Sequence, residues 1–175
     1  MRALVVYESM FGSTRAVAQS VAQGLGETME VDVAEVGAVA AAPEGADLPD
    51  GVDLLVVGGP THAFGMTRAS TRLDAAKDAT APLVSSGVGI REWLDAVQLP
   101  ARVAFATFDT KVATPNLPGS AARAAERRLR RLGGHAVVHA QTFTVHGKSD
   151  GLVAGQLEAA REWGRRLGTL LAPVG

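Results

Sequence analysis

The chain of 175 residues has no cysteine, which excludes disulfides, thiolate chemistry and iron–sulfur ligation by its own side chains. Its histidines show none of the close spacings typical of a metal site; they are His62, His135, His139 and His146. No apolar run approaches the ~18 residues of a membrane-spanning helix. Because the sequence starts at Met1 without the apolar segment of a signal peptide, we expect a soluble, cytoplasmic protein.

Basic residues are missing from a long stretch near the N-terminus. Between Ala16 and Thr67 there is no lysine or arginine, whereas the acidic residues there are Glu27, Glu30, Asp32, Glu35, Glu44, Asp47, Asp50 and Asp53. Since the formal net charge of the chain is -1, the remainder carries about +7. This pattern fits a polarised surface that steers a charged partner, and it equally fits an uneven scatter of solvated charges.

A hydroxyl-rich turn without lysine follows the first apolar segment. Residues 4–21 read as a buried strand, a turn with one glycine, and a helix with apolar residues at four-residue spacing. The first N–H groups of such a helix lack partners and carry its positive dipole end, which favours an anion. Ser9, Ser13 and Thr14 add hydroxyls, and Gly12 lets the backbone approach a ligand closely. We therefore expect a phosphate site; the alternative is a turn whose hydroxyls only cap the helix.

The same turn lacks the residues of the common nucleotide-binding motifs. A nucleoside-triphosphate loop needs GxxxxGK[ST], but no lysine occurs before Arg68. A dinucleotide fingerprint needs GxGxxG, and this turn has only Gly12. The sequence thus predicts a phosphate monoester held mainly by neutral donors and the helix dipole, with Arg15 as the only nearby cation.

A second informative loop, residues 58–66, has the sequence GGPTHAFGM and follows an apolar strand at 52–57. A flat apolar ring needs small residues for access, a plane to stack on, and main-chain donors at its polar edge. The loop contains all three, with His62 and Phe64 as the two candidate planes. The alternatives are an exposed or capping role for His62 and simple core filling for Phe64.

The order of elements predicts a doubly wound, three-layer α/β sandwich forming a single domain over residues 1–175. Further strands are expected at 29–36, 102–108 and 135–145, and further helices at 68–79, 89–97, 120–132 and after 152. No helix is predicted between 37 and 51. Strands alternating with helices give a parallel sheet covered on both faces. Ligands bind beyond the carboxyl ends of such strands, so residues 8–14, 58–66 and 107–111 are expected to converge.

The first turn resembles the phosphate loop of flavodoxins. Every position of that signature is matched by Val5, Val6, Tyr7, Ser9, Gly12, Thr14, Ala18 and Val21. The second loop is similar to their second flavin-binding loop in the spacing of Thr61, His62 and Gly65, with His62 where those proteins commonly have tryptophan. Phe108 and Asp109 are the nearest equivalents of a third flavin loop, whose usual tyrosine is absent.

The resemblance implies a five-stranded parallel sheet of order 2-1-3-4-5 and noncovalent FMN. It implies Ser9, Gly12, Ser13 and Thr14 on the phosphate, Thr61, His62 and Gly65 around the ring, and Phe108 and Asp109 at its far rim. The full set of expected cofactor-binding residues is Ser9, Met10, Phe11, Gly12, Ser13, Thr14, Pro60, Thr61, His62, Phe64, Gly65, Thr107, Phe108 and Asp109. A receiver domain shares this strand order, but it needs an aspartate after strand three, where this chain has Gly58-Gly59-Pro60.

Three functions are compatible with this resemblance. The first is an electron carrier that docks redox partner proteins, with no catalytic side chain and no metal. The second is an FMN-dependent NAD(P)H or quinone reductase that uses a small-molecule electron acceptor, and the third is a flavin-free binding module. The arginines of 120–132 lack interleaved aromatics and are interpreted as a solvated helix face, so no nucleic-acid partner is expected. The sequence leaves open whether the protein is a monomer or a homo-oligomer.

Overall fold

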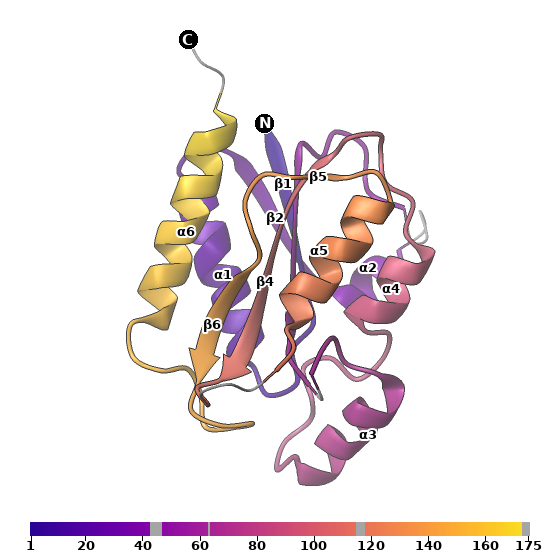
Figure 1. Ribbon diagram of the computed structural model, residues 1–175, viewed down its shortest axis with the longest axis vertical. Coiled ribbons are helices and arrows are strands. Elements are labelled where there is room, and N and C mark those ends of the chain that lie inside the picture. Colours follow the sequence, from indigo (N-terminus) through magenta and orange to yellow (C-terminus); the bar gives the residue numbers. More distant parts are fainter. Residues whose placement is uncertain (43–46, 63, 115–117, 173–175) are drawn as a thin grey trace.

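A parallel β-sheet runs through the centre of the computed structural model, which describes residues 1–42, 47–62, 64–114 and 118–172 (Figure 1). Its strands are β1 (Arg2–Tyr7), β2 (Glu30–Glu35), β3 (Leu54–Pro60), β4 (Ala104–Val112), β5 (His135–Ala136) and β6 (Gln141–Val145). The strand order is β2-β1-β3-β4-β5, and β6 also pairs with β4. This confirms the predicted doubly wound order.

Helices cover both faces of the sheet (Figure 1). One face carries α1 (Ser13–Leu25) and α6 (Gln156–Leu171), and the other carries α2 (Val36–Ala40), α4 (Ile90–Ala96) and α5 (Ala121–Arg131). The remaining helix, α3 (Ala69–Asp78), lies beyond the edge of the sheet at which the arrowheads of β4 and β6 end. None of the helices in the described ranges combines the length and apolar character needed to cross a membrane.

The fourth strand is longer than predicted, and the fifth is divided. β4 continues to Val112 because residues 108–112 pair with residues 141–145 of β6. Residues 107–111 are therefore strand, whereas the sequence predicted a loop there. Phe105 pairs with Ala136 but Phe108 pairs with Gln141, so the chain beside β4 contains two extra residues between these pairs. They bulge out of the sheet and separate β5 from β6.

The short helix α2 occupies part of the stretch in which no helix was predicted. The Glu35 side chain accepts hydrogen bonds from the N–H groups of Gly37 and Ala38, at 2.8 and 3.2 Å. A carboxylate at a helix N-terminus satisfies otherwise unpaired donors and stabilises such a turn. The predicted loop extends to residue 51, and its residues 43–46 lie outside the described ranges.

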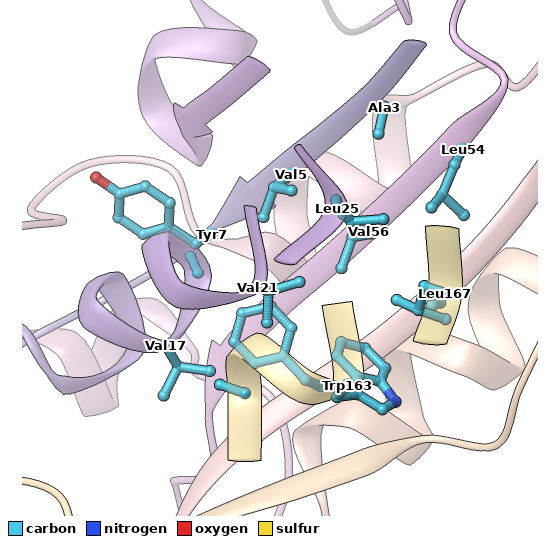
Figure 2. Close-up of a cluster of buried hydrophobic side chains, with 14 of the residues drawn as sticks. Ala3, Val5, Tyr7, Val17, Val21, Leu25, Leu54, Val56, Trp163 and Leu167 are labelled. Atoms are coloured by element: carbon cyan, nitrogen blue, oxygen red, sulfur yellow. The ribbon is translucent and has the colours of Figure 1, made fainter. Parts of the chain in front are cut away.

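The core on the α1 and α6 face fixes the position of α1. Figure 2 shows Val17 and Val21 of α1 in the same buried cluster as Trp163 of α6. Trp163 makes edge-to-face contacts with Phe108 and Phe143 at ring-centroid distances of 6.2 and 6.1 Å. Trp163 is therefore a core residue, as predicted. Because α1 is packed along its length, its N-terminus is held at the carboxyl edge of the sheet.

Candidate functional site

The turn between β1 and α1 leaves main-chain donors without partners. Gly12 has φ +97°, a left-handed conformation that favours glycine, and directly precedes the helix. The Ser9 hydroxyl oxygen accepts hydrogen bonds from the N–H groups of Gly12 and Arg15, at 3.1 and 3.3 Å. Within the described chain, the N–H groups of Ser13 and Thr14 have no acceptor. Ser9 thus shapes the turn, and the next two amides are available to an anion.

Two contacts from distant segments hold this turn in place. The hydroxyls of Thr14 and Thr110 lie 2.8 Å apart and join the helix to β4. Ser85 accepts a hydrogen bond from the Ser9 N–H at 3.0 Å and donates its own N–H to the Ser9 carbonyl at 2.8 Å. Sequence reasoning missed Ser85 and Thr110, because no local pattern signals a contact across more than 70 residues.

A cavity opens beside the turn. Its narrow part, of about 60 Å³, is lined by Ser9, Met10, Phe11, Ser13, Thr14, Pro60, Thr61, His62, Thr110, Val112, Val145, Gly147 and Lys148. Its wide part, of about 290 Å³, extends to α3 and is lined by Phe11, Thr61, His62, Thr71, Asp74, Ala75, Asp78, Val112 and Lys148. The two parts lie side by side, because they share the lining residues Phe11, Thr61, His62, Val112 and Lys148. The structure therefore brings together the first turn and the start of the second loop.

The second loop presents His62 to the cavity and directs Phe64 away from it. His62 and Gly65 exchange two main-chain hydrogen bonds of 2.9 and 3.0 Å, which close a tight turn. Phe64, with φ +71°, is 62% exposed at the tip of this turn and lines neither part of the cavity. Ala63, in the same predicted loop, lies outside the described residues. Of the two candidate planes, His62 is the one that lines the cavity.

The surroundings of His62 disfavour its charged form. Burial is the largest cause, and the positive charge of Lys148 is the second; both lower the pKa of the imidazole below its usual value of 6.5. The imidazole ring also provides a flat surface in the cavity lining, which it shares with Lys148.

The carboxyl group of Asp109 accepts the hydrogen bonds of a network at the start of α5. Its fully buried carboxyl group accepts from the hydroxyls of Thr61, Ser120 and Thr142, at 2.8, 2.6 and 2.7 Å. It also accepts from the N–H of Ala122, at 3.1 Å. The group joins β3, β4, β6 and the N-terminus of α5. It stabilises the edge at which the cavity lies and lines neither cavity part.

The side chains of residues 107–109, which were expected to contact the ligand, are buried in the structure. Because these residues lie in a strand, their side chains alternate between the two faces of the sheet. Phe108 is fully buried in the core beside Phe143 and Trp163. Thr107 is also buried, and its hydroxyl has no hydrogen-bond partner among the described residues. Residues 107–109 therefore support the site from inside the protein.

A buried polar cluster lies behind the turn. Glu8 accepts hydrogen bonds from the Thr67 hydroxyl and from the N–H of Ile90, the latter at 2.9 Å, and lies 3.8 Å from the guanidinium of Arg72. Arg72 in turn pairs with Glu92 at 3.0 Å. Burial raises the pKa of Glu8, and these donors oppose the shift. The cluster fastens α3 and α4 to the residue that precedes Ser9.

Comparisons with known proteins agree with this architecture. A family model described as flavodoxin matches residues 5–163. No curated protein sequence matches the chain. Solved structures with the same fold include oxidised flavodoxin 1 from Bacillus cereus, which is 16% identical with a TM-score of 0.70 over 98% of this chain and 100% of that one.

Two other structures have comparable coverage. A flavodoxin from the domain Archaea is 16% identical, with a TM-score of 0.66 over 97% of each chain. A flavodoxin, WrbA-like protein from Agrobacterium tumefaciens is 18% identical, with a TM-score of 0.58 over 97% of this chain and 96% of that one. At these identities the likeness establishes the fold.

Proposed function

Because the chain belongs to the flavodoxin family, we propose that it binds FMN noncovalently and carries electrons between redox partners through this cofactor. The observation that carries the proposal concerns Ser13 and Thr14, which line the narrow cavity part and whose N–H groups have no acceptor among the described residues. A phosphate monoester supplies the acceptors that these donors lack. The flavin supplies the redox chemistry when bound, and the chain positions it.

In this proposal the narrow cavity part takes the phosphate. Ser13 and Thr14 donate their N–H groups to the phosphate oxygens, and the dipole of α1 adds a favourable field. A Cβ atom built on Gly12 would have no other atom within 4 Å, so the turn has open space for a ligand at this residue. Ser9 fixes the turn and has its own hydroxyl hydrogen to donate.

The wide cavity part then takes the flavin ring. Phe11 and His62 line both parts, so each is placed to lie against the ring or at its junction with the phosphate tail. Pro60, Met10 and Thr61 complete the wall nearest the phosphate. Phe64 and Gly65 shape the turn that carries His62, and we propose this supporting role for them.

A reductase acting on small molecules is the second candidate. The helix α3 provides Thr71, Asp74, Ala75 and Asp78 to the wide part of the cavity. A wall of this kind next to the ring favours a substrate pocket over a ring edge that is open to a partner protein. Under this alternative, NAD(P)H would reduce the flavin and a quinone would reoxidise it.

Spectroscopy with added cofactor tests both candidates. Purified protein is titrated with FMN, and the complex is then mixed anaerobically with NADPH and a quinone. The carrier predicts tight FMN binding, stepwise one-electron reduction by dithionite and slow NADPH oxidation. Rapid, quinone-dependent NADPH oxidation would favour the reductase over the electron carrier. A protein that leaves the FMN spectrum and fluorescence unchanged would contradict both proposals.

A further inference from the structure

Lys148 brings to the cavity a positive charge that differs from the one expected from the sequence. It lies in the loop after β6 and lines both the narrow and the wide part. Among the described lining residues it is the one lysine or arginine. Arg15, the cation expected from the sequence, is exposed on α1 and lines neither part. The one cationic side chain in the described cavity lining therefore comes from the C-terminal third of the chain.

The partner of Lys148 is an acidic side chain on the opposite wall. Its Nζ atom lies 3.3 Å from a carboxylate oxygen of Asp78 in α3. The two side chains are 76% and 57% exposed, so water screens the pair and holds its net strength low. A dianion in the same cavity would compete well for the ammonium group, because it carries more charge than one carboxylate.

The charge of Lys148 acts across the cavity. It contributes to lowering the pKa of His62 and, as the smallest cause, that of Asp74. Asp74 and Asp78 both line the wide part, where their charges repel an anionic ligand. Lys148 opposes this repulsion at the junction with the narrow part. A ligand that carries a phosphate thus depends on Lys148 in a way that an uncharged ligand does not.

We propose that Lys148 selects the phosphorylated flavin over its dephosphorylated form, exchanging Asp78 for the phosphate that the Ser13 and Thr14 N–H groups hold. This inference rests on the proposed function and deepens it. In the exchange no covalent bond changes; one ion pair replaces another. Asp78 is then a competitor, and its removal should have the opposite effect to removal of Lys148.

The test compares affinities for FMN and riboflavin, followed by flavin fluorescence quenching at low and moderate salt. We expect Lys148→Gln to weaken FMN binding about 5- to 30-fold, with riboflavin binding changed less than about 2-fold. Asp78→Asn should tighten FMN binding about 2- to 5-fold, and this gain should vanish in the double variant. Arg127→Gln is the control for the loss of one positive charge, since Arg127 is exposed on α5 and lines neither cavity part.

Several outcomes would overturn the inference. Equal losses of affinity for FMN and riboflavin in Lys148→Gln would mean that Lys148 shapes the cavity and does not select the phosphate. Unchanged FMN affinity in Lys148→Gln, or a loss of FMN affinity in Asp78→Asn, would also refute it. Thermal unfolding of each variant checks the fold. If the unmodified protein binds neither flavin, the proposed function itself fails; if it binds FMN and the variants do not discriminate, only the role of Lys148 fails.

Discussion

Individual hydrogen-bonding groups in the first turn have separate tasks. Ser9 satisfies the N–H groups of Gly12 and Arg15, whereas those of Ser13 and Thr14 find no acceptor in the part of the chain that the structure describes. A capping side chain that served only the helix would be expected to consume the free donors. The turn therefore combines a fixed backbone with unsatisfied amides, which is the arrangement that an anion completes.

Replacing Ser13 by glutamate tests this division directly. The new carboxylate would occupy the mouth of the phosphate site and repel the ligand. Because two anions would then compete for one site, Ser13→Glu should weaken FMN binding by at least about 100-fold. Gln19→Glu adds the same charge to an exposed position of α1 and should leave the affinity within about 3-fold. Isothermal titration measures both, and similar affinities for the two variants would contradict the assignment.

Asp109 should stabilise the protein mainly because its carboxylate oxygens accept hydrogen bonds, and less because its side chain fills space. Asp109→Ala removes the acceptor of four donors, the buried N–H of Ala122 and three partly buried hydroxyls, and should lower the free energy of unfolding by about 3–5 kcal/mol. Asp109→Asn keeps one carbonyl oxygen for three of them, and its amide can donate to the Thr142 hydroxyl, so about 1–2 kcal/mol is expected. Urea unfolding distinguishes these values; equal losses would argue against a network held by acceptors.

His62 should make stability depend on pH in a known direction. Its folded-state pKa is lowered below 6.5, so the unfolded chain binds more protons between that pKa and 6.5. The free energy of unfolding should therefore rise with pH through this window, and the contribution is lost as the pH falls through the folded-state pKa. In His62→Gln this contribution is absent, so the free energy of unfolding should differ less between pH 5 and pH 7 than it does in the unmodified protein.

Histidine proton resonances provide the independent measurement. The resonance that disappears in His62→Gln should titrate below pH 6.5 in the unmodified protein. Because Lys148 is the second cause of the shift, Lys148→Gln should raise this pKa. A His62 resonance that titrates above 6.5 would show that the side chain is not buried in the cavity wall.

At the scale of elements, close packing of α1 on α6 positions the phosphate turn. A Cβ atom on Gly24 would overlap the carbonyl oxygen of Arg161, and one on Gly164 would overlap that of Val21. The absence of side chains at these two glycines lets the helices approach backbone to backbone. Any separation of the pair would move the N-terminus of α1 relative to β1 and β4.

Gly164→Ala should therefore reduce both stability and ligand binding. Overpacking of this kind costs about 1–3 kcal/mol, and we expect a lower melting temperature together with weaker FMN binding. Gly87→Ala is the control, because a Cβ atom there meets nothing within 4 Å. It should be neutral or slightly stabilising, by less than about 1 kcal/mol. If Gly164→Ala melts like the unmodified protein, the helices are not in such close contact.

Elements with a local signal were predictable from the sequence. Residues 4–21 give a strand, turn and helix because hydrophobic periodicity and the hydroxyl-rich turn lie within one short stretch. The length of β4 was not predictable, since Asp109 and Thr110 read as turn residues and become strand only by pairing with β6. The contacts of Thr14 with Thr110 and of Lys148 with Asp78 depend on tertiary structure alone.

At the scale of the molecule, two acidic residues of the stretch that lacks lysine and arginine pair with basic residues outside it. Glu27 contacts Arg161 and Arg165 of α6, at 3.3 and 2.8 Å, and Asp32 contacts Arg2 at 2.8 Å. Basic residues from the N-terminus and from the C-terminal helix thus meet acidic residues of this stretch. These pairs lie at the surface, where water screens their charges.

The central claim is that the main-chain N–H groups at the start of α1 hold the phosphate of FMN. Amide chemical shifts, recorded by two-dimensional NMR while ligand is added, test it most directly. With FMN, the Ser13 and Thr14 amide protons should move downfield by far more than those elsewhere in α1, and with riboflavin they should move little. Resonances of Ser13 and Thr14 that stay unchanged at saturating FMN, or that respond equally to riboflavin, would contradict the account.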